Sequence, residues 1–526
     1  MTLESINKRI KSFFDDKLIF SFLTFFILTL IVHGFMFANK ITNHDDIHQL
    51  YNIMDLRISG RWFLQYASGI SSPLSMPWMN GLLITLYGSV SFGLIVKLLE
   101  FRNKFIIFLM AFLITSFPAG VAKYLYMNSA DGYVFALLMS TIASYVYVKG
   151  GNIGKILYII LNILSLATYQ IYLGYSVSLV VIYYAVKSIY ENDSFKNYFK
   201  RVFILGIISI LTLVFYIISV KYIFVVELTS YQGLDSIGTF DIHKLLWGVI
   251  RAYTDPFRFF IIDNFRILKV LKYANIILFS GIIYILFDNI KIEGGLNRDK
   301  ILSLFLSLIV LPLTINLVYI LINGGYAGLR MLYSYIIYYV IVFVILERYL
   351  RLNYQKHLEL NRVKIASLGL IFVILFANIF NFTLYTNRVY FSLYLDNKHL
   401  EAFTNRLITK IEEEDFYSEN KTINFIGYTD IDNEFSKQYS TDDILASTLL
   451  EHKIPGHIHY KLYPSRYLAF NNKIKMIFDE EYDKIDDENL LKEIENRKVY
   501  PSMDSIFEYN NEIYVKFKDY NNDWKN

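Results

Sequence analysis

Residues 18–38 read LIFSFLTFFILTLIVHGFMFA and contain no Lys, Arg, Asp or Glu. A bilayer core about 30 Å thick needs roughly 20 apolar residues in a helix, so this run is long enough to cross a membrane. It is too long for the apolar part of a signal peptide and lacks a small-residue cleavage site, which favours a permanent span. Further runs of this kind lie near residues 76–96, 105–122, 133–148, 202–226, 273–287, 301–322, 331–346 and 365–385.

The composition agrees with a polytopic membrane protein. Of the 526 residues, 55% are hydrophobic and 19% are charged, whereas a soluble domain carries about 25% charged residues. These proportions exclude a disordered chain, a nucleic-acid binder built on basic patches, and a simple soluble enzyme. The chain has no Cys, which excludes disulfides, thiolate metal sites and a Cys nucleophile.

The run LYIILNILSLATYQIYLGYSVSLVVIYYAV, residues 157–186, is longer than one span and short for two. We interpret it as two short helices that meet at Tyr169–Gln170, because the Lys and Arg residues on both flanks then fall on one side. This gives eleven spans. The segments on the same side as the N-terminus carry most of the Lys and Arg of the loops, so the N-terminus is predicted to be cytoplasmic and the C-terminus extracytoplasmic.

Residues 386–526 differ from the part before them, because apolar runs stop and charge rises. KTINFIGYT (421–429) alternates as a strand does, and SIFEYNNEIYVKF (505–517) resembles a hairpin that turns at Asn510–Asn511. DDILASTLLEHK (442–453) and DENLLKEIENRK (487–498) have acidic first turns typical of helices. The prediction is a mainly α transmembrane domain over 1–385 and a small α/β or α+β extracytoplasmic domain over 386–526.

The segment 43–62, NHDDIHQLYNIMDLRISGRW, follows the first span and carries the strongest catalytic candidates, Asp45 and Asp46. Apolar residues from Ile47 to Ile58 recur at helical spacing, which predicts a helix on the membrane surface. One aspartate could act as a general base, and the other could orient an acceptor hydroxyl or hold a divalent cation such as Mg²⁺ or Mn²⁺. The alternative is that the acidic pair only caps the helix. His44 and His48 have metal-ligand spacing but are more typical of interfacial polar residues, and no metal site is predicted from them.

Three arginines are candidates for binding a lipid phosphate. Arg57 and Arg61 are one helical turn apart in the predicted surface helix, and Arg330 enters an otherwise uncharged span. A guanidinium fork suits phosphate, although the same residues could extend to the lipid headgroups without a specific role.

Other polar and aromatic residues at the outer ends of the spans are candidates for contacting sugar or acceptor: His48, Trp62, Asp131, Tyr169 and Gln170. An amide such as Gln170 can bind sugar hydroxyls, but it can equally bridge loop backbone. Trp62 is an ordinary interfacial aromatic unless it stacks on a sugar. Asp131 is predicted to lie in an outer loop, 123–132. The outer loop 227–272 contains an amphipathic stretch, HKLLWGVIRAY, and is long enough to be functional.

Several motifs are absent from the sequence. There is no P-loop, no GxGxxG, no GxSxG and no HExxH. Coupling to ATP and hydrolysis by a Ser or zinc centre therefore have no support. No Pro- or Gly-broken pair of spans recurs in two halves, so a secondary transporter is not favoured.

The order HDD (44–46), SGRW (59–62), TYQIYLGY (168–175) and VYPSMDSIFEYNNEIYVK (499–516) resembles the serotype-converting O-antigen glucosyltransferases, the glucosyl transferase II family. These belong to the GT-C class of integral membrane glycosyltransferases. The resemblance extends over about residues 10–520. It implies transfer of a sugar, usually glucose, from a polyprenyl-phosphate carrier to a surface glycan at the outer face of the bacterial cytoplasmic membrane. It also implies that the catalytic carboxylates follow the first span, at Asp45 and Asp46.

The mechanism expected is a single displacement, in which an aspartate deprotonates the acceptor hydroxyl and a lipid phosphate leaves. Cationic residues near the surface would stabilise that phosphate. Two alternatives remain open. One is a glycan polymerase or ligase that uses a diphosphate-linked donor, and the other is a flippase for lipid-linked glycans that forms no bond.

Overall fold

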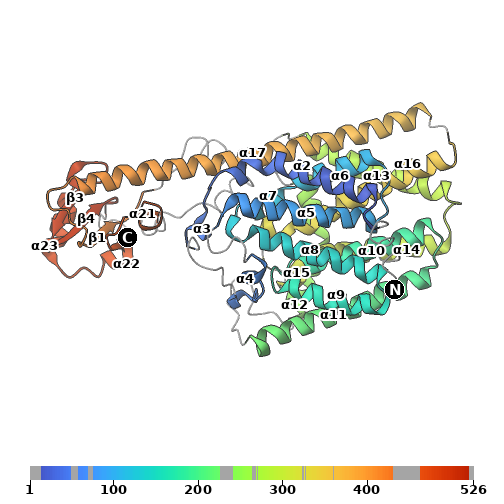
Figure 1. Cartoon of the computed structure of the whole chain (residues 1–526), viewed down its shortest axis with the longest axis horizontal. Helices are drawn as coiled ribbons and strands as arrows, with labels where there is room; N and C mark the ends of the chain where they lie inside the picture. Colours follow the sequence, from blue (N-terminus) through green and yellow to red (C-terminus); the bar gives the residue numbers. More distant parts are fainter. Residues whose placement is uncertain are drawn as a thin grey trace. The chain divides into compact units, whose positions relative to one another are not determined.

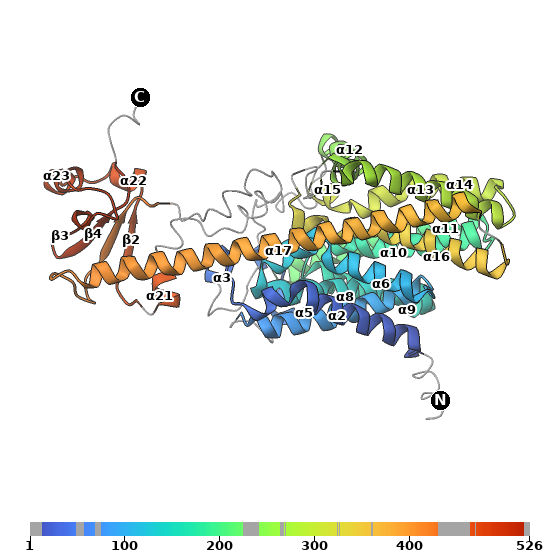
Figure 2. The ribbon, with the colours of Figure 1, turned by 90° about the horizontal axis from the view of Figure 1, so that it is seen from above.

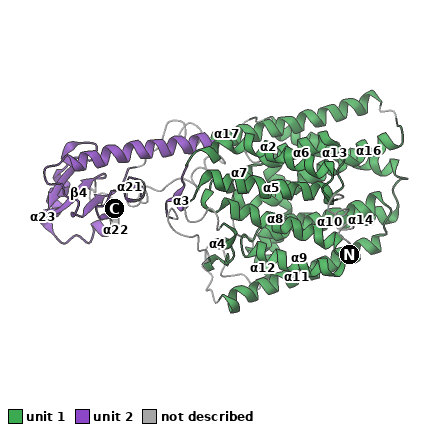
Figure 3. Cartoon of the chain, in the orientation of Figure 1, with its two compact units in different colours: residues 1–40, 51–388 green, residues 41–50, 389–526 purple. Residues whose placement is uncertain are grey.

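The chain is described here from a computed structural model, for residues 13–48, 57–68, 75–224, 241–262, 268, 270–322, 325, 327–358, 361–429, 463–468 and 470–519. It divides into two compact units (Figure 3). One comprises Met1–Lys40 and Tyr51–Arg388, and the other comprises Ile41–Leu50 and Val389–Asn526.

The described part of the first unit is helical (Figures 1 and 2). Its α-helices are α2 (Asp16–Ala38), α4 (Leu64–Ala67), α5 (Pro77–Leu98), α6 (Lys104–Ser116), α7 (Pro118–Tyr124), α8 (Met127–Lys149), α9 (Gly151–Leu166), α10 (Tyr172–Tyr190), α11 (Phe195–Ile218), α12 (Ile242–Phe257), α13 (Leu271–Ile292), α14 (Arg298–Ile315), α15 (Leu317–Leu321), α16 (Ile336–Gln355) and most of the apolar half of α17 (Arg362–Glu412). Its 3-10 and π turns are η1 (Arg57–Ser59), η2 (Ser219–Ile223), η4 (Arg258–Ile262) and η5 (Leu329–Tyr335).

Among the described residues, helices cover most of every run predicted to span the membrane, but the count of eleven is not confirmed. In the described part of the chain, eight helices are long and apolar enough to cross a membrane: α2, α5, α8, α10, α11 with η2, α13, η5 with α16, and α17. A ninth results if α6 and α7, bent by 48°, form one span. The other two runs differ, because α9 has only 16 residues and α14 begins with Arg298, Asp299 and Lys300.

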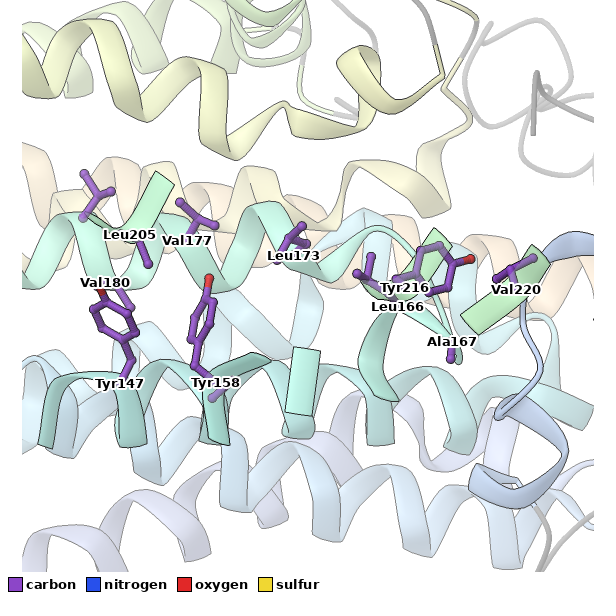
Figure 4. Close-up of a cluster of buried hydrophobic side chains, with 12 residues drawn as sticks. Tyr147, Tyr158, Leu166, Ala167, Leu173, Val177, Val180, Leu205, Tyr216 and Val220 are labelled. Carbon is purple, nitrogen blue, oxygen red and sulfur yellow. The ribbon is translucent and has the colours of Figure 1, made fainter. Parts of the chain in front are cut away.

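The predicted break near Tyr169–Gln170 is confirmed, since α9 ends at Leu166 and α10 begins at Tyr172. Both helices pack into one apolar core that α8, α11 and η2 complete (Figure 4). Tyr147, Tyr158 and Tyr216 supply its largest side chains. Beside it, Ser140 donates to Asn162 Oδ1 at 3.1 Å and Asn162 donates to Ser176 Oγ at 3.3 Å. These bonds satisfy buried polar groups and fix how α8, α9 and α10 meet.

Gly174 allows α10 and α14 to approach closely. A Cβ at this position would lie 2.4 Å from the carbonyl oxygen of Thr314. Four residues later, Ser178 donates to Thr314 Oγ1 at 2.9 Å, which holds the same two helices together.

We therefore expect Gly174→Ala to lower stability by about 1–3 kcal/mol, since backbone must move to admit the methyl group. Gly206→Ala is a matched control, because a Cβ on this α11 glycine has no neighbour within 4 Å. The melting temperature of the purified chain should fall for Gly174→Ala and stay constant or rise slightly for Gly206→Ala. Equal melting temperatures for the two variants would contradict the close approach.

The loop predicted over residues 123–132 is wrong. Lys123 lies on α7, and Asn128 and Asp131 lie on the first turns of α8. All three side chains are buried. Polar residues usually indicate a loop, but here they are buried between helices, and Pro118 at the first turn of α7 starts a new helix.

The amphipathic stretch in 227–272 forms α12, which ends in the π turn η4. Arg251 donates to Asp255 at 3.1 Å and to the carbonyl of Gly325 at 2.6 Å, and its guanidinium lies over the ring of Tyr319. Residues 225–240 and 263–267, including Asp263 and Arg266, lie outside the described residues. Arg251 and Asp255 therefore bind within the helical unit.

The second unit contains a four-stranded mixed sheet in the order β2-β1-β4-β3. Its strands are β1 (Ile423–Ile426), β2 (Ile474–Ile477), β3 (Ile506–Tyr509) and β4 (Glu512–Lys516). Strand β1 is parallel to β2 and β4, while β3 and β4 form the predicted antiparallel hairpin. Asn510 and Asn511 have φ of 49° and 61°, the left-handed pair that a two-residue hairpin turn requires.

Four short helices belong to this unit: α3 (His44–His48), α21 (Tyr463–Tyr467), α22 (Asp479–Tyr482) and α23 (Glu488–Asn496). Asp487 caps α23, accepting from the backbone N–H groups of Asn489 and Leu490. The Tyr509 hydroxyl donates to the same carboxylate at 2.7 Å and lowers the pKa of Asp487. The helix predicted over 442–453 lies outside the described residues.

The boundary between the units differs from the predicted one at residue 386. Helix α17 continues without a break to Glu412, because no Gly or Pro follows Gly369 within it. The segment 41–50, predicted to be part of an outer loop of the transmembrane domain, groups with Val389–Asn526 instead. Thr42 accounts for this contact, since its backbone N–H and hydroxyl both donate to Asn397 Oδ1, at 3.0 and 2.6 Å.

Candidate functional site

Arg61 is the centre of a polar and aromatic cluster in the first unit. Its guanidinium lies over the ring of Tyr169, 4.9 Å from the centroid, and 5.9 Å from that of Tyr133. The two tyrosine rings stack on each other at 4.3 Å. Arg61 Nε donates to Gln170 Oε1 at 3.2 Å. Within the described part of the chain, this arginine forms no ion pair with a carboxylate, so neutral groups hold its charge in place.

Gln170 anchors the segment that carries Arg61. Its amide donates to the carbonyl of Ser59 at 2.6 Å and to the hydroxyl of Tyr216 at 3.2 Å. Tyr216 in turn donates to the carbonyl of Gly60 at 3.1 Å. The sequence interpretation left open whether this amide binds sugar or bridges backbone, and the structure shows that it bridges backbone while it also holds Arg61.

Trp62 is fixed on both its polar and its apolar side. The indole N–H donates to Ser219 Oγ at 3.1 Å, and the ring stacks on Phe224 at 4.3 Å with an interplanar angle of 15°. One ring face is thus already covered. Next to it, Phe63 N donates to the carbonyl of Ala167 at 2.8 Å, which ties this segment to the break between α9 and α10.

The predicted pairing of Arg57 with Arg61 on one helical face is wrong. Arg57 is exposed in the 3-10 turn η1, and Gly60 then adopts φ of 73°, which ends any helix before Arg61. The helix predicted over 43–62 therefore does not reach Arg61. Its first residues form α3, and residues 49–56 lie outside the described part.

Lys123 is a second cation held by tyrosines. It is fully buried, its ammonium donates to the Tyr172 hydroxyl at 2.7 Å, and it lies 3.4 Å from the centroid of the Tyr333 ring. No carboxylate of the described residues lies within ion-pair distance of it. A buried ammonium without a counter-ion is costly, so this residue is a candidate for binding an anionic group.

A chain of tyrosine rings connects Arg61 with Lys123. Tyr169 contacts Tyr172 at 5.8 Å between centroids, and Tyr172 contacts Tyr333 at 5.9 Å. Both cations therefore belong to one cluster, which we call the tyrosine cluster (Tyr133, Tyr169, Tyr172 and Tyr333).

Arg330 lies on η5 and Asp131 lies on α8, the elements that also carry Tyr333 and Tyr133 of the tyrosine cluster. Their side chains have other partners. Arg330 lies over the ring of Tyr126 at 4.5 Å. Asp131 is buried on α8 and accepts from Asn80 Nδ2 at 3.4 Å. A role for either residue in phosphate or sugar binding stays a prediction.

Asp45 and Asp46 differ sharply in their surroundings in the second unit. Asn43 and Asp46 form a reciprocal cap: Asp46 N donates to Asn43 Oδ1 at 2.9 Å, and Asn43 N donates to Asp46 Oδ2 at 3.3 Å. The Asp46 side chain is buried. Asp45 is 40% exposed, and its Oδ1 lies 3.2 Å from His44 Nε2. Asp46 thus caps the helix, which is the structural role considered above for both aspartates. Asp45 is the more accessible of the two carboxylates.

His48 is exposed at the end of α3. Among the described residues, no group of three or more His, Asp or Glu side chains is arranged to hold a metal ion. A divalent cation at Asp45 and Asp46 therefore stays a prediction. No further His, Asp or Glu among the described residues is placed to complete such a site.

The model of the GtrII glucosyl transferase family matches residues 34–347, which contain Arg61, Lys123 and the whole tyrosine cluster. The chain belongs to this family. Membership indicates a glycosyltransferase, which uses a sugar donor and a glycan acceptor, and the long apolar helices are consistent with a membrane protein. Comparison with curated proteins and with solved structures gave no match.

Sequence reasoning found Arg61, Trp62, Tyr169 and Gln170, which this member of the GtrII family brings together. It missed Tyr133, Tyr172, Tyr216 and Tyr333 and gave Lys123 no role. The chain has 44 tyrosines, so no pattern distinguishes these four. A lone Lys between apolar runs was the available signal for Lys123, and it was instead interpreted as part of a loop.

Proposed function

We propose that the chain is a GT-C class enzyme that transfers glucose from a polyprenyl-phosphate carrier to a cell-surface glycan, such as O-antigen, at the outer face of the bacterial cytoplasmic membrane. The N-terminus would be cytoplasmic and the unit with residues 389–526 extracytoplasmic, as the distribution of Lys and Arg favours.

One observation supports this proposal above all: Arg61 and Lys123 are held by neutral tyrosines and an amide, without a carboxylate partner among the described residues. The charge of Arg61 is therefore available to an anion, and a bound anion would favour the charged form of the buried Lys123. A glycosyl phosphate brings that anion with it, and its charge grows as the phosphate leaves.

The proposed reaction is a single displacement. The oxygen of an acceptor hydroxyl attacks the anomeric carbon, and the bond from that carbon to the phosphate oxygen breaks. The electron pair goes to the phosphate, and the hydroxyl proton goes to the Asp45 carboxylate. Asp45 is preferred over Asp46 because it is exposed and does not form the helix cap. The role of Asp45 rests on the resemblance stated above, and Arg61 and Lys123 are proposed to stabilise the leaving phosphate because of their contacts within the first unit. A divalent cation such as Mg²⁺ or Mn²⁺ at Asp45 and Asp46 stays a prediction.

The donor can be tested directly with the full chain in proteoliposomes. Polyprenyl-phosphate glucose is expected to give a new glycoside on a purified surface glycan, detected by mass spectrometry. A diphosphate-linked oligosaccharide in a parallel tube is expected to give none, and liposomes without protein serve as the blank. Transfer from the diphosphate donor alone would instead support a polymerase or ligase, and movement of lipid without any glycosidic bond would support a flippase.

A further inference from the structure

Two adjoining cavities lie at the end of the helical unit remote from Arg61. One, of about 330 Å³, is lined almost entirely by apolar side chains of α10, α13, α14 and α16. The other, of about 270 Å³, is lined mainly by charged side chains. Tyr190 lines both, so the two cavities meet at its side chain. The charged residues of the second cavity are Glu100, Arg102, Glu191, Glu293, Arg348 and Arg351.

The apolar cavity opens on the outside of the helical unit. Helix α13 packs on α16 and α14 packs on α10, and the cavity lies between these pairs. Ile283 and Leu308 line it and are 55% and 70% exposed. On a membrane-spanning bundle such residues face hydrocarbon, so the cavity suits a lipid chain better than water.

Only some of the charged side chains that line the polar cavity form ion pairs within the protein. Arg348 bridges Glu191 at 3.5 Å and Glu100 at 3.9 Å, and Lys187 binds the same two carboxylates. In contrast, Arg102, Arg351 and Glu293 form no side-chain ion pair with any described residue. Two guanidinium groups and one carboxylate can thus bind a ligand, although the charge of Arg102 also interacts with the nearby Glu347.

We propose that the two cavities form one site for a phospholipid whose headgroup carries both a phosphate and a primary ammonium, as in phosphatidylethanolamine. An acyl chain would occupy the apolar cavity, the phosphate would bind Arg102 and Arg351, and the ammonium would donate to Glu293. Other headgroups fit the charges less well. An anionic phosphatidylglycerol or a polyprenyl phosphate leaves Glu293 without a partner, and the quaternary ammonium of phosphatidylcholine has no hydrogen to donate.

This site is distinct from the tyrosine cluster. Gln170 lies just before α10 and Tyr190 is the last of the 19 residues of that helix, so the polar cavity, which would hold the headgroup, lies about 28 Å from Gln170. The apolar cavity begins at Ile182, about 15 Å along α10 from Tyr172. The lipid proposed here is therefore not the sugar donor, and the inference does not depend on the proposed reaction.

The test is native mass spectrometry of the delipidated full chain, titrated with phosphatidylethanolamine, phosphatidylglycerol and phosphatidylcholine that have identical acyl chains. One phosphatidylethanolamine per chain is expected to bind at least about tenfold more tightly than the other two lipids. The double variant Arg102→Gln/Arg351→Gln should weaken this binding by about tenfold or more, and Glu293→Gln should remove the preference over phosphatidylglycerol.

Two further variants keep the test decisive. Arg298→Gln removes an exposed charge near the same end that lines neither cavity, and should bind as the wild type does. Ala185→Phe fills the apolar cavity and should lose the lipid with all charges intact, with melting curves to show that each variant is folded. Equal binding of the three lipids, wild-type affinity in the double arginine variant, displacement by polyprenyl phosphate, or equally tight binding of the headgroup without acyl chains would each overturn the proposal.

Discussion

Replacement of Asp45 by Asn is expected to lower glucose transfer by about 10²- to 10⁴-fold, the usual effect of removing a general base. Asn keeps the size of the side chain and cannot accept the proton of the acceptor hydroxyl. The side chain is partly exposed and contacts His44, so the chain should still fold and insert. The measurement is the initial rate of glycoside formation from polyprenyl-phosphate glucose at equal amounts of inserted protein.

Asp46→Asn is the matched comparison for this variant. Its side-chain oxygen can still accept from Asn43 N and so preserve the cap on α3. We expect transfer to stay within about tenfold of the wild type, since a cap is worth only about 0.5–2 kcal/mol of stability. If Asp46→Asn is inactive and Asp45→Asn is not, the base is Asp46. If both keep full activity, neither aspartate is the base.

Arg61→Gln is the second change with a large expected effect, a loss of about 10²- to 10³-fold in kcat/KM. Gln removes the charge that would stabilise the leaving phosphate, while Gln170 can still bind Ser59 and Tyr216 through its own amide. Arg61→Lys should recover only part of the activity, because an ammonium cannot both lie flat on Tyr169 and donate to Gln170 as a guanidinium does.

Arg57→Gln separates a specific role of Arg61 from the general positive charge of the segment. Arg57 is exposed in η1 and precedes the turn at Gly60, so its loss should cost less than about tenfold in kcat/KM. Similar losses of kcat/KM for Arg57→Gln and Arg61→Gln would show that the contacts of Arg61 with the tyrosine cluster give it no special role. The proposal that Arg61 binds the phosphate would then be withdrawn.

Where local sequence rules decide the structure, the sequence predicted it well. The hairpin at Asn510–Asn511 follows from two residues that tolerate positive φ. The break at Tyr169–Gln170 followed from length and from the charges on both flanks. Arg61 and Gln170 were both selected as polar groups at the ends of spans, which is a costly place for them.

Where packing decides, the prediction failed. Lys123, Asn128 and Asp131 were assigned to a loop because they are polar, but other helices surround them. The helical spacing of 43–62 predicted one surface helix and did not anticipate the turn that Gly60 makes. Tyr133 contacts Arg61, which is 72 positions away in the sequence, and Tyr216 contacts Gly60, which is 156 positions away. No local pattern in the sequence predicts contacts over such separations.

The shortness of α9 has a consequence for the bilayer around the enzyme. Its 16 residues extend about 24 Å, less than the roughly 30 Å of a hydrocarbon core. Its outward-facing Ile153, Ile156 and Ile160 are exposed, so lipid beside them must thin to match. The mismatch would thin the bilayer along α9, and headgroups would therefore also move inward at the end where α9 gives way to Gln170. A carrier lipid arriving along this helix would have its phosphate lowered toward Arg61 before any contact with the protein's polar groups is made.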